Sequence, residues 1–369
     1  MKILVTGSNG FIGKNLLAEL RNKGYEDILT FTKESPFEDL ALYTKECDFV
    51  FHLAGVSRTE NDDEFISGNA DLTGMLLELL RLNNNRSPVL FSSSIQAGKD
   101  SPYGQSKKLA EQHLFSHSEI NKSKVLIYRL PNLFGKWGKP HYNSVVSTFC
   151  YNVANGHPIS ITDEKKILAL NYIDDVINEF IMALTNKETW KDEYCIVPHT
   201  HEVTLGELAG KILAFKQNRE TLLMPSLKTD FDKALYGTYL SYLNQESFSY
   251  PLNKRTDVRG WLAEFMKSES MGQLFISRTK PGITRGNHWH HSKVEKFLVV
   301  KGQASIKFRN VGSNSIIEYK VDGDEPEVVD IPAGYTHSLE NIGNDELITL
   351  FWASEIFDQE RPDTFFMEV

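Results

Sequence analysis

TGSNGFIG, at residues 6–13, follows the short apolar run Lys2–Val5 and leads into an amphipathic segment from Phe11 to Arg21. This order predicts a β-strand, a glycine-rich turn and a helix. Glycine lets the backbone turn sharply and approach a ligand closely, and a helix N-terminus offers free N–H groups and a positive dipole end. The stretch therefore predicts a pyrophosphate site in a doubly wound, Rossmann-type α/β domain. Its glycines are Gly7, Gly10 and Gly13.

A second stretch, SSSIQAGKDSPYGQSK at residues 92–107, places Tyr103 four residues before Lys107. On a helix these two share a face, so the ammonium should lower the phenol pKa from about 10. The preceding run Val89–Phe91 predicts a buried parallel strand that delivers Ser94 to its carboxyl end, where ligands gather in open α/β sheets. A Tyr-x-x-x-Lys pair also occurs on solvated helix faces, but its place after this strand favours proton transfer.

Together the two stretches resemble the motifs of the extended short-chain dehydrogenases. The resemblance implies a catalytic set of Ser94, Tyr103 and Lys107. Extended members act on sugar nucleotides, which they epimerise, dehydrate or reduce with shared hydride and proton machinery. Ile95 and Gln96 stand where the dehydratases carry an Asp-Glu pair, so elimination of water is not expected.

The expected cofactor is NADPH. The predicted strand Asp27–Thr32 should end at the adenosine ribose, where a carboxylate would bind the 2′-hydroxyl of NAD. Lys33 follows that strand and would tolerate a 2′-phosphate, although Glu34 keeps NADH open and Lys33 can equally be a solvated turn residue. Small residues after the predicted strand Cys47–Leu53 should let the adenosine half approach the backbone. The predicted cofactor contacts are Gly7, Gly10, Phe11, Ile12, Gly13, Thr32, Lys33, Leu53, Ala54, Gly55, Tyr103 and Lys107.

Three more segments of the first domain have expected roles. Asn69–Leu80 should be a helix in which Asn69 resembles the family's structural asparagine. KVLIYRLPNLFG, at residues 124–135, resembles the Arg-x-x-Asn-x-x-Gly segment of sugar-nucleotide enzymes, which makes Asn132 either a substrate-binding or a turn-capping residue. Asp174 and Asp175 should cap a helix N-terminus and offset its dipole.

From about Tyr250 short apolar runs alternate with glycine turns, which predicts an all-β barrel or jelly roll. We therefore expect a dehydrogenase domain at residues 1–245 and a second domain at 246–369. GITRGNHWHHSKVEKFLVVKG, at residues 282–302, and PAGYTHSLEN, at residues 332–341, resemble the two cupin motifs. Pro326 stands where the second motif has its leading glycine.

The cupin motifs predict a metal site. His288 and His290 alternate along a strand and share a face, Glu295 lies on the next stretch, and His337 can approach across the barrel. Three imidazoles and a carboxylate suit zinc, iron, nickel or manganese, and zinc is the expected ion. Ordinary barrel histidines are the alternative reading.

The two-domain arrangement resembles bifunctional capsular-polysaccharide enzymes on the route to UDP-N-acetyl-L-fucosamine. The resemblance implies C3 epimerisation of a UDP-2-acetamido-2,6-dideoxy-hexos-4-ulose in the cupin domain, then NADPH-dependent C4 reduction to UDP-2-acetamido-2,6-dideoxy-L-talose. A cation would stabilise the enolate that forms when the C3 proton leaves. NKRTDVRGWLAEF, at residues 253–265, resembles a segment of keto-sugar epimerase cupins, which usually lack a metal. A purely structural role for the ion is therefore the alternative to a catalytic one. Candidates for the proton-transfer residue are Lys296, Tyr335 and His291.

Three other functions remain open from the sequence: a nucleotide-sugar 4-epimerase with a structural cupin, a non-catalytic sugar or redox sensor, and a cupin dioxygenase. The net charge of -9 over 369 residues argues against nonspecific binding to nucleic acid or to an acidic membrane. Scattered Cys47, Cys150 and Cys195 give no disulfide framework. Without a signal pattern or an apolar run near the roughly 18 residues of a membrane span, a cytoplasmic location is expected. Extended dehydrogenases and cupins commonly form two-fold dimers, so the resemblance implies a homodimer.

Overall fold

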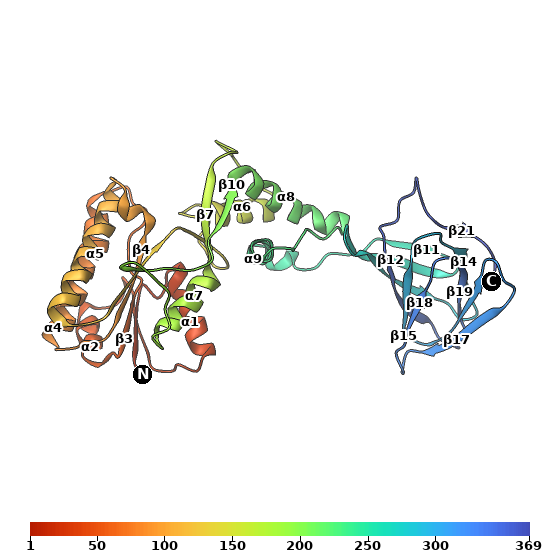
Figure 1. Cartoon of the computed structure of the whole chain (residues 1–369), viewed down its shortest axis with the longest axis horizontal. Helices are drawn as coiled ribbons and strands as arrows, with labels where there is room; N and C mark the ends of the chain where they lie inside the picture. Colours follow the sequence, from red (N-terminus) through yellow and green to blue (C-terminus); the bar gives the residue numbers. More distant parts are fainter. The chain divides into compact units, whose positions relative to one another are not determined.

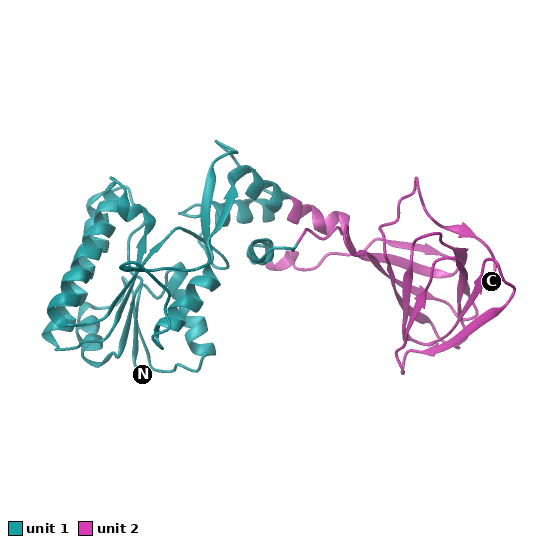
Figure 2. Cartoon of the chain, viewed as in Figure 1, with its two compact units in different colours: residues 1–213, 227–244 teal, residues 214–226, 245–369 magenta.

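The computed structural model describes residues 1–369 and divides the chain into two compact units (Figure 1). The first unit contains residues 1–213 and 227–244, and the second contains residues 214–226 and 245–369 (Figure 2). None of the helices combines the length and apolar character that crossing a membrane requires.

A seven-stranded sheet in the order β2-β1-β3-β4-β5-β9-β8 forms the centre of the first unit. All neighbouring strands are parallel except the antiparallel pair of β8 and β9. The chain leaves β1 on one side for β2 and returns on the other side for β3, and ligands bind at the carboxyl ends of strands at such a switch point. The strands are β1 Ile3–Thr6, β2 Ile28–Phe31, β3 Phe49–His52, β4 Val89–Ser94, β5 Val125–Leu130, β8 Trp190–Lys191 and β9 Tyr194–Cys195.

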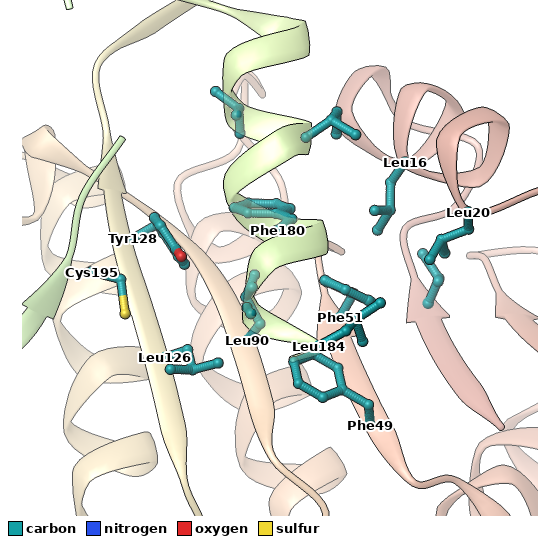
Figure 3. Packing of buried hydrophobic residues seen from close by; sticks show 14 of the residues in the cluster. Leu16, Leu20, Phe49, Phe51, Leu90, Leu126, Tyr128, Phe180, Leu184 and Cys195 are labelled. Carbon is teal, nitrogen blue, oxygen red and sulfur yellow. The ribbon is translucent and has the colours of Figure 1, made fainter. Parts of the chain in front are cut away.

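Alternating side chains of the buried strands pack against helices on both faces of this sheet. Ile3 and Val5 point into a cluster with the helices α1 (Phe11–Asn22) and α7 (Ile173–Ala183), and Figure 3 shows Leu16, Leu20 and Phe180 of that cluster. Leu4 points the other way, into a cluster with α2 (Phe37–Glu46), α4 (Leu72–Leu82) and α5 (Pro102–Asn121). Burial on both faces explains why these strands read as continuous apolar runs.

A smaller sheet in the order β10-β7-β6 completes the first unit. Its strands are β6 Asn132–Phe134, β7 Ile167–Tyr172 and β10 His201–Thr204, and the remaining helical elements of this unit are α3 Asp63–Phe65, η1 Ile66–Asp71, η2 Ile95–Gly98, α6 Val145–Ala154 and α9 Asp230–Leu240. The helix α8 Leu205–Thr221 begins in the first unit and ends in the second, which also contains η3 Gln245–Ser247.

Two local expectations for the first unit need correction. The helix predicted from Asn69 begins earlier, because η1 is a π-helical turn that runs directly into α4. Single π turns of this kind occur mostly within helices near functional sites. Asp174 and Asp175 lie in the first turn of α7, but its N-cap is Tyr172 and no side chain caps it. The two carboxylates therefore offset the helix dipole without capping the helix.

The second unit contains two sheets whose strands pair antiparallel. Apolar side chains from both sheets share one core, which includes Phe297 and Phe351 from one sheet and Ile306 and Leu339 from the other. The predicted combination of a Rossmann-type parallel sheet with an all-β second domain is confirmed. One sheet has the order β11 (Lys254–Asp257), β12 (Gly260–Ser268), β13 (Gly272–Thr279), β20 (Leu347–Ala353), β15 (Glu295–Lys301), β18 (Val328–Ile331); the other has β17 (Ile316–Asp322), β16 (Gln303–Asn310), β19 (Tyr335–Asn341), β14 (Thr284–Trp289), β21 (Phe365–Phe366).

Candidate functional site

The glycine turn between β1 and α1 leaves room for a phosphate. Gly7 has φ +69°, and a Cβ there would lie 2.6 Å from the backbone nitrogen of Ala54. A Cβ on Gly13 would lie 2.4 Å from the carbonyl oxygen of Gly7. Gly10 is the N-cap of α1 and provides no side-chain cap, and the partly buried Phe11 and Ile12 form the first helical turn. The N–H groups at this helix end are thus available to an anion.

The turn after β2 holds both a cation and a carboxylate. The backbone N–H of Thr32 donates to Ser35 Oγ at 3.1 Å, and the N–H of Glu34 donates to Thr32 Oγ1 at 3.3 Å. Lys33 and Glu34 are both exposed. Hydrogen bonding with Thr32 lowers the pKa of Glu34 and keeps it ionised. The turn therefore offers a partner for either a 2′-phosphate or a 2′-hydroxyl.

The predicted catalytic residues meet between β4 and α5. Ser94 ends β4, and Tyr103 lies in the first turn of α5, where Ser101 caps the helix by accepting from Gly104 N at 3.1 Å. The Ser94 side chain is close enough to Tyr103 to lower the pKa of its phenol. One turn along α5, the buried Lys107 belongs to the same site.

The ammonium of Lys107 is held by the strand beneath it. Its Nζ donates to the carbonyl oxygen of Ser92 at 3.0 Å and lies 4.6 Å from the centre of the Phe91 ring. A Cβ on Gly55 would come within 3.2 Å of this Nζ. Gly55 and its half-buried neighbours Leu53 and Ala54 therefore bring the loop after β3 to the catalytic lysine.

Burial sets the pKa values of the two titratable catalytic groups. It lowers the pKa of Lys107 to about 8, and the charge of Glu111 opposes this shift. It raises the pKa of Tyr103, and the Ser94 side chain only partly offsets the increase. The prediction that the pKa of Tyr103 is lowered is wrong for the chain without a bound cofactor. Desolvation of the phenolate raises this pKa by more than the stabilising contacts lower it.

Buried polar residues fix the position of this site. Asn69 is fully buried; it accepts from Val56 N at 3.0 Å and donates to Val56 O at 2.9 Å and to Ser106 Oγ at 3.0 Å. Ser106 Oγ in turn donates to the carbonyl oxygen of Tyr103 at 2.8 Å. Asn69 therefore joins the loop after β3 to the catalytic helix, which matches its expected structural role.

A cleft of about 660 Å³ that was not predicted from the sequence lies between Arg58, in the loop after β3, and residues 141–148. Arg58 Nη1 donates to the carbonyl oxygen of Tyr142 at 2.7 Å, which joins the loop after β3 to the opposite wall. Tyr142 links this cleft electrostatically to the predicted catalytic site, because its hydroxyl adds a small increase to the pKa of Tyr103 after the larger effect of burial. Asn132 is exposed on β6 and is not among the lining residues. The lining residues are Arg58, His141, Tyr142, Asn143, Ser144, Val145 and Thr148.

The second unit brings the four predicted metal ligands together. One ligand atom from each of His288, His290, Glu295 and His337 lies within 4.8 Å of all the others. His288 and His337 are paired residues of β14 and β19, His290 follows β14, and Glu295 begins β15. Glu295 Oε2 lies 3.5 Å from His290 Nε2 and 3.4 Å from His337 Nε2.

The chemistry of this cluster fits a divalent cation. The buried Nε2 atoms of His290 and His337 have no hydrogen-bond partner. Burial opposes ionisation of Glu295, but the two neighbouring histidines hold its pKa well below the usual range. Burial also lowers the pKa of His288 to about 4, so its imidazole is neutral at physiological pH. Neutral imidazoles beside an ionised carboxylate form a donor set typical of zinc and related ions.

The three candidates for proton transfer differ in position. Lys296 is exposed, pairs with Asp330, and alternates along β15 to the face opposite Glu295. Tyr335 packs against the core of the unit, and its carbonyl oxygen lies 3.4 Å from His337 Nδ1. His291 is exposed, and its ring contacts Trp289. Lys296 therefore points away from the ligand cluster and is a poor candidate for proton transfer there.

Comparisons with known proteins agree with this architecture over the whole chain. Residues 3–196 match the NAD dependent epimerase/dehydratase family, and residues 255–365 match the polysaccharide biosynthesis C-terminal domain. A UDP-2-acetamido-2,6-beta-L-arabino-hexul-4-ose reductase from Pseudomonas aeruginosa is 42% identical over 365 residues, which are 99% of this chain and 98% of the relative.

Two further matches differ in how much of the chain they cover. A crystal structure of the capsular polysaccharide assembling protein CapF from Staphylococcus aureus has a TM-score of 0.95 and 47% identity, with 100% of both chains covered. The spore coat polysaccharide biosynthesis protein SpsL from Bacillus subtilis is 24% identical over 122 residues, which are 30% of this chain and 81% of the relative. The chain therefore belongs to the NAD dependent epimerase/dehydratase family and carries a polysaccharide biosynthesis C-terminal domain.

Proposed function

We propose that this protein is a bifunctional enzyme that acts on a UDP-2-acetamido-2,6-dideoxy-hexos-4-ulose. The second unit inverts C3, and the first unit then reduces the C4 ketone with NADPH to give UDP-2-acetamido-2,6-dideoxy-L-talose for capsule synthesis. The main support is the full-length match to a reductase of a UDP-linked hexul-4-ose, in a chain that retains the Ser94, Tyr103 and Lys107 site.

The first unit contains the groups that ketone reduction needs. NADPH would deliver a hydride to the sugar C4 while Tyr103 donates its hydroxyl proton to the C4 oxygen. The phenol of Tyr103 is protonated at neutral pH even at its ordinary pKa of about 10, and burial raises that pKa further, so the group carries the proton that the C4 oxygen needs. Ser94 would hydrogen-bond the ketone, and Lys107 would hold the nicotinamide ribose. The cleft between Arg58 and residues 141–148 is where we place the sugar nucleotide.

NADPH is preferred because Lys33 is exposed at the end of β2, where the adenosine ribose is expected. A guanidinium or ammonium at this position can pair with a 2′-phosphate. Glu34 lies on the same turn and could bind the 2′-hydroxyl of NADH, so we expect a preference for NADPH and not an absolute selection. The ratio of the KM values for NADH and NADPH measures this preference.

The second unit contains a site for the epimerisation. His288, His290, Glu295 and His337 would hold a divalent ion, with zinc as the expected one. Such an ion supplies Lewis-acid stabilisation of negative charge that develops on a carbonyl oxygen. The C3 hydrogen is α to the C4 ketone, so stabilising that charge makes C3 acidic enough for proton removal. Tyr335 and His291 remain the candidates for moving that proton.

The experiment that tests the proposal combines the substrate, NADPH and deuterated water. The 4-keto UDP-sugar made by a 4,6-dehydratase is incubated with the enzyme, and the product is examined by NMR. We expect one NADPH oxidised per product and deuterium at C3. If the NADPH absorbance stays constant and the purified protein retains oxidised cofactor, the chain is a 4-epimerase and the proposal is wrong.

Two variants separate the two activities. Tyr103→Phe should abolish NADPH oxidation and leave deuterium exchange at C3 intact. His290→Ala should abolish the exchange. Continued exchange in His290→Ala would contradict the assignment of epimerisation to the second unit.

A further inference from the structure

The metal-ligand strand β14 is tied to the end of the chain. In the pairing of β14 with β21, His288 is opposite Phe366 and Trp289 is opposite Phe365. The N–H of Met367 also donates to the carbonyl oxygen of Asn287 at 3.0 Å. The C-terminal segment 362–367 therefore runs along the strand that carries the first ligand.

Asp363 is the residue of this segment that contacts a ligand. Its backbone carbonyl oxygen lies 2.6 Å from His290 Nδ1. A carbonyl only accepts, so Nδ1 carries the proton and Nε2 keeps the lone pair. That Nε2 is buried, has no hydrogen-bond partner and lies 3.5 Å from Glu295 Oε2. The Asp363 carbonyl thus selects the tautomer and ring orientation that present Nε2 to the other ligands.

The carboxylate of Asp363 fixes the turn that follows His290. It accepts from the backbone N–H groups of His291 at 2.8 Å, Ser292 at 3.0 Å and Lys293 at 2.9 Å, and from the Ser292 hydroxyl at 3.1 Å. Hydrogen bonds to an ionised acceptor are stronger than those between neutral groups. The same side chain therefore holds the backbone on the C-terminal side of the ligand while the carbonyl holds its ring.

Lys293 holds the segment in place from the other side. Its buried Nζ donates to the carbonyl oxygen of Pro362 at 3.3 Å and to Thr364 Oγ1 at 2.9 Å. The residues on both sides of Asp363 are thus bonded to the turn that Asp363 organises. The arrangement is reciprocal, because each partner restricts the position of the other.

We propose that Asp363 is a positioning residue for the cation site and that the affinity of the second unit for a divalent ion depends on it. The inference rests on the proposed metal site but is independent of the reaction. Groups that orient a ligating histidine typically change metal affinity by about 10–100-fold when removed.

The test measures Zn²⁺ affinity of the full-length protein by competition with a chromophoric chelator. Asp363→Ala keeps the backbone carbonyl that contacts His290 Nδ1 and removes the carboxylate that holds the turn, so it should weaken Zn²⁺ binding by about 10-fold, the low end of the range for groups that orient a ligand. Asp363→Asn keeps the size of the side chain and one acceptor oxygen, so its loss should be smaller. Asp358→Ala is the matched control: Asp358 lies shortly before this segment but accepts only from Glu360 N and pairs with Arg361, so the affinity of the variant should equal that of the wild type.

A second readout separates positioning from general stability. The visible absorption of bound Co²⁺, which reports ligand geometry, should change in Asp363→Ala and stay unchanged in Asp358→Ala. Wild-type affinity and an unchanged Co²⁺ spectrum in Asp363→Ala would overturn the inference. If Asp363→Ala does not fold, the same result in folded Asp363→Asn would overturn it. If the wild-type protein binds neither ion, the proposed metal site itself is wrong.

Discussion

Replacing Lys107 by methionine should stabilise the protein that contains no cofactor while removing its reductase activity. Burial lowers the pKa of Lys107 from 10.5 to about 8. Each pKa unit corresponds to about 1.4 kcal/mol, so the buried ammonium destabilises the folded state by about 3 kcal/mol. The lost hydrogen bond to the Ser92 carbonyl offsets about 1 kcal/mol of that gain. We expect Lys107→Met to raise the free energy of unfolding at pH 7 by about 2 kcal/mol.

The pH dependence has a definite sign. Below about pH 8 the lysine is protonated in both the folded and the unfolded states, so the advantage of the variant is constant. Between about 8 and 10.5 the unfolded state binds more protons than the folded state. Stability of the wild type therefore rises with pH in that window, and the advantage of Lys107→Met should shrink by about 3 kcal/mol across it.

Urea unfolding followed by circular dichroism measures this difference, because the helices lie mostly in the first unit. Lys108→Met is the matched control: Lys108 is the next residue on α5 and is exposed, so its replacement should change stability by less than about 0.5 kcal/mol at any pH. The reasoning is refuted if Lys107→Met is less stable than the wild type at pH 7 and the difference stays constant from about pH 8 to 10.5.

Three further substitutions test other parts of the structure. Gly7→Ala should weaken NADPH binding at least tenfold and lower the unfolding temperature, because its φ is +69° and its Cβ meets backbone; Gly24→Ala, at φ +80° with no atom within 4 Å, isolates the strain of about 1–2 kcal/mol from the collision. Lys33→Glu should raise the KM for NADPH at least tenfold, about 1.4 kcal/mol, with little change for NADH, and equal changes for both cofactors would contradict the assignment. Glu111→Gln removes the buried carboxylate that pairs with Arg129 at 2.6 Å, and urea unfolding should show that the free energy of unfolding falls by about 3 kcal/mol. Glu46→Gln, in the exposed pair with Lys2, should lower it by less than about 1 kcal/mol.

Much of the site was predictable because its residues are close in sequence or at the ends of regular elements. Ser94 ends a strand whose apolar run is visible in the sequence, and Tyr103 and Lys107 are one helical turn apart. The cluster of predicted metal ligands was foreseeable for a similar reason, since His288 and His290 are two residues apart at the end of one strand. In each case the local period determines which side chains share a face.

The features that were not predicted depend on packing between distant segments. Asp363 contacts a histidine 73 residues away through its backbone oxygen, which any residue carries, so only the pairing of β21 with β14 reveals the contact. The cleft wall at Arg58 and Tyr142 likewise joins residues 84 apart. The direction of the Tyr103 pKa was missed because it depends on how completely the surrounding chain excludes water, and spacing along a helix does not report that.

The ligand cluster draws on both sheets of the second unit: Glu295 belongs to the six-stranded one, while His288 and His337 belong to the five-stranded one. An ion bound by all of them would crosslink the two sheets of this unit in addition to any role in catalysis. By mass action, free ion at a hundred times its dissociation constant would add about 2.7 kcal/mol to the resistance of this unit to unfolding. A cell starved of that ion would then hold a less stable β-domain, so more of the protein would be open to degradation when the ion is scarce.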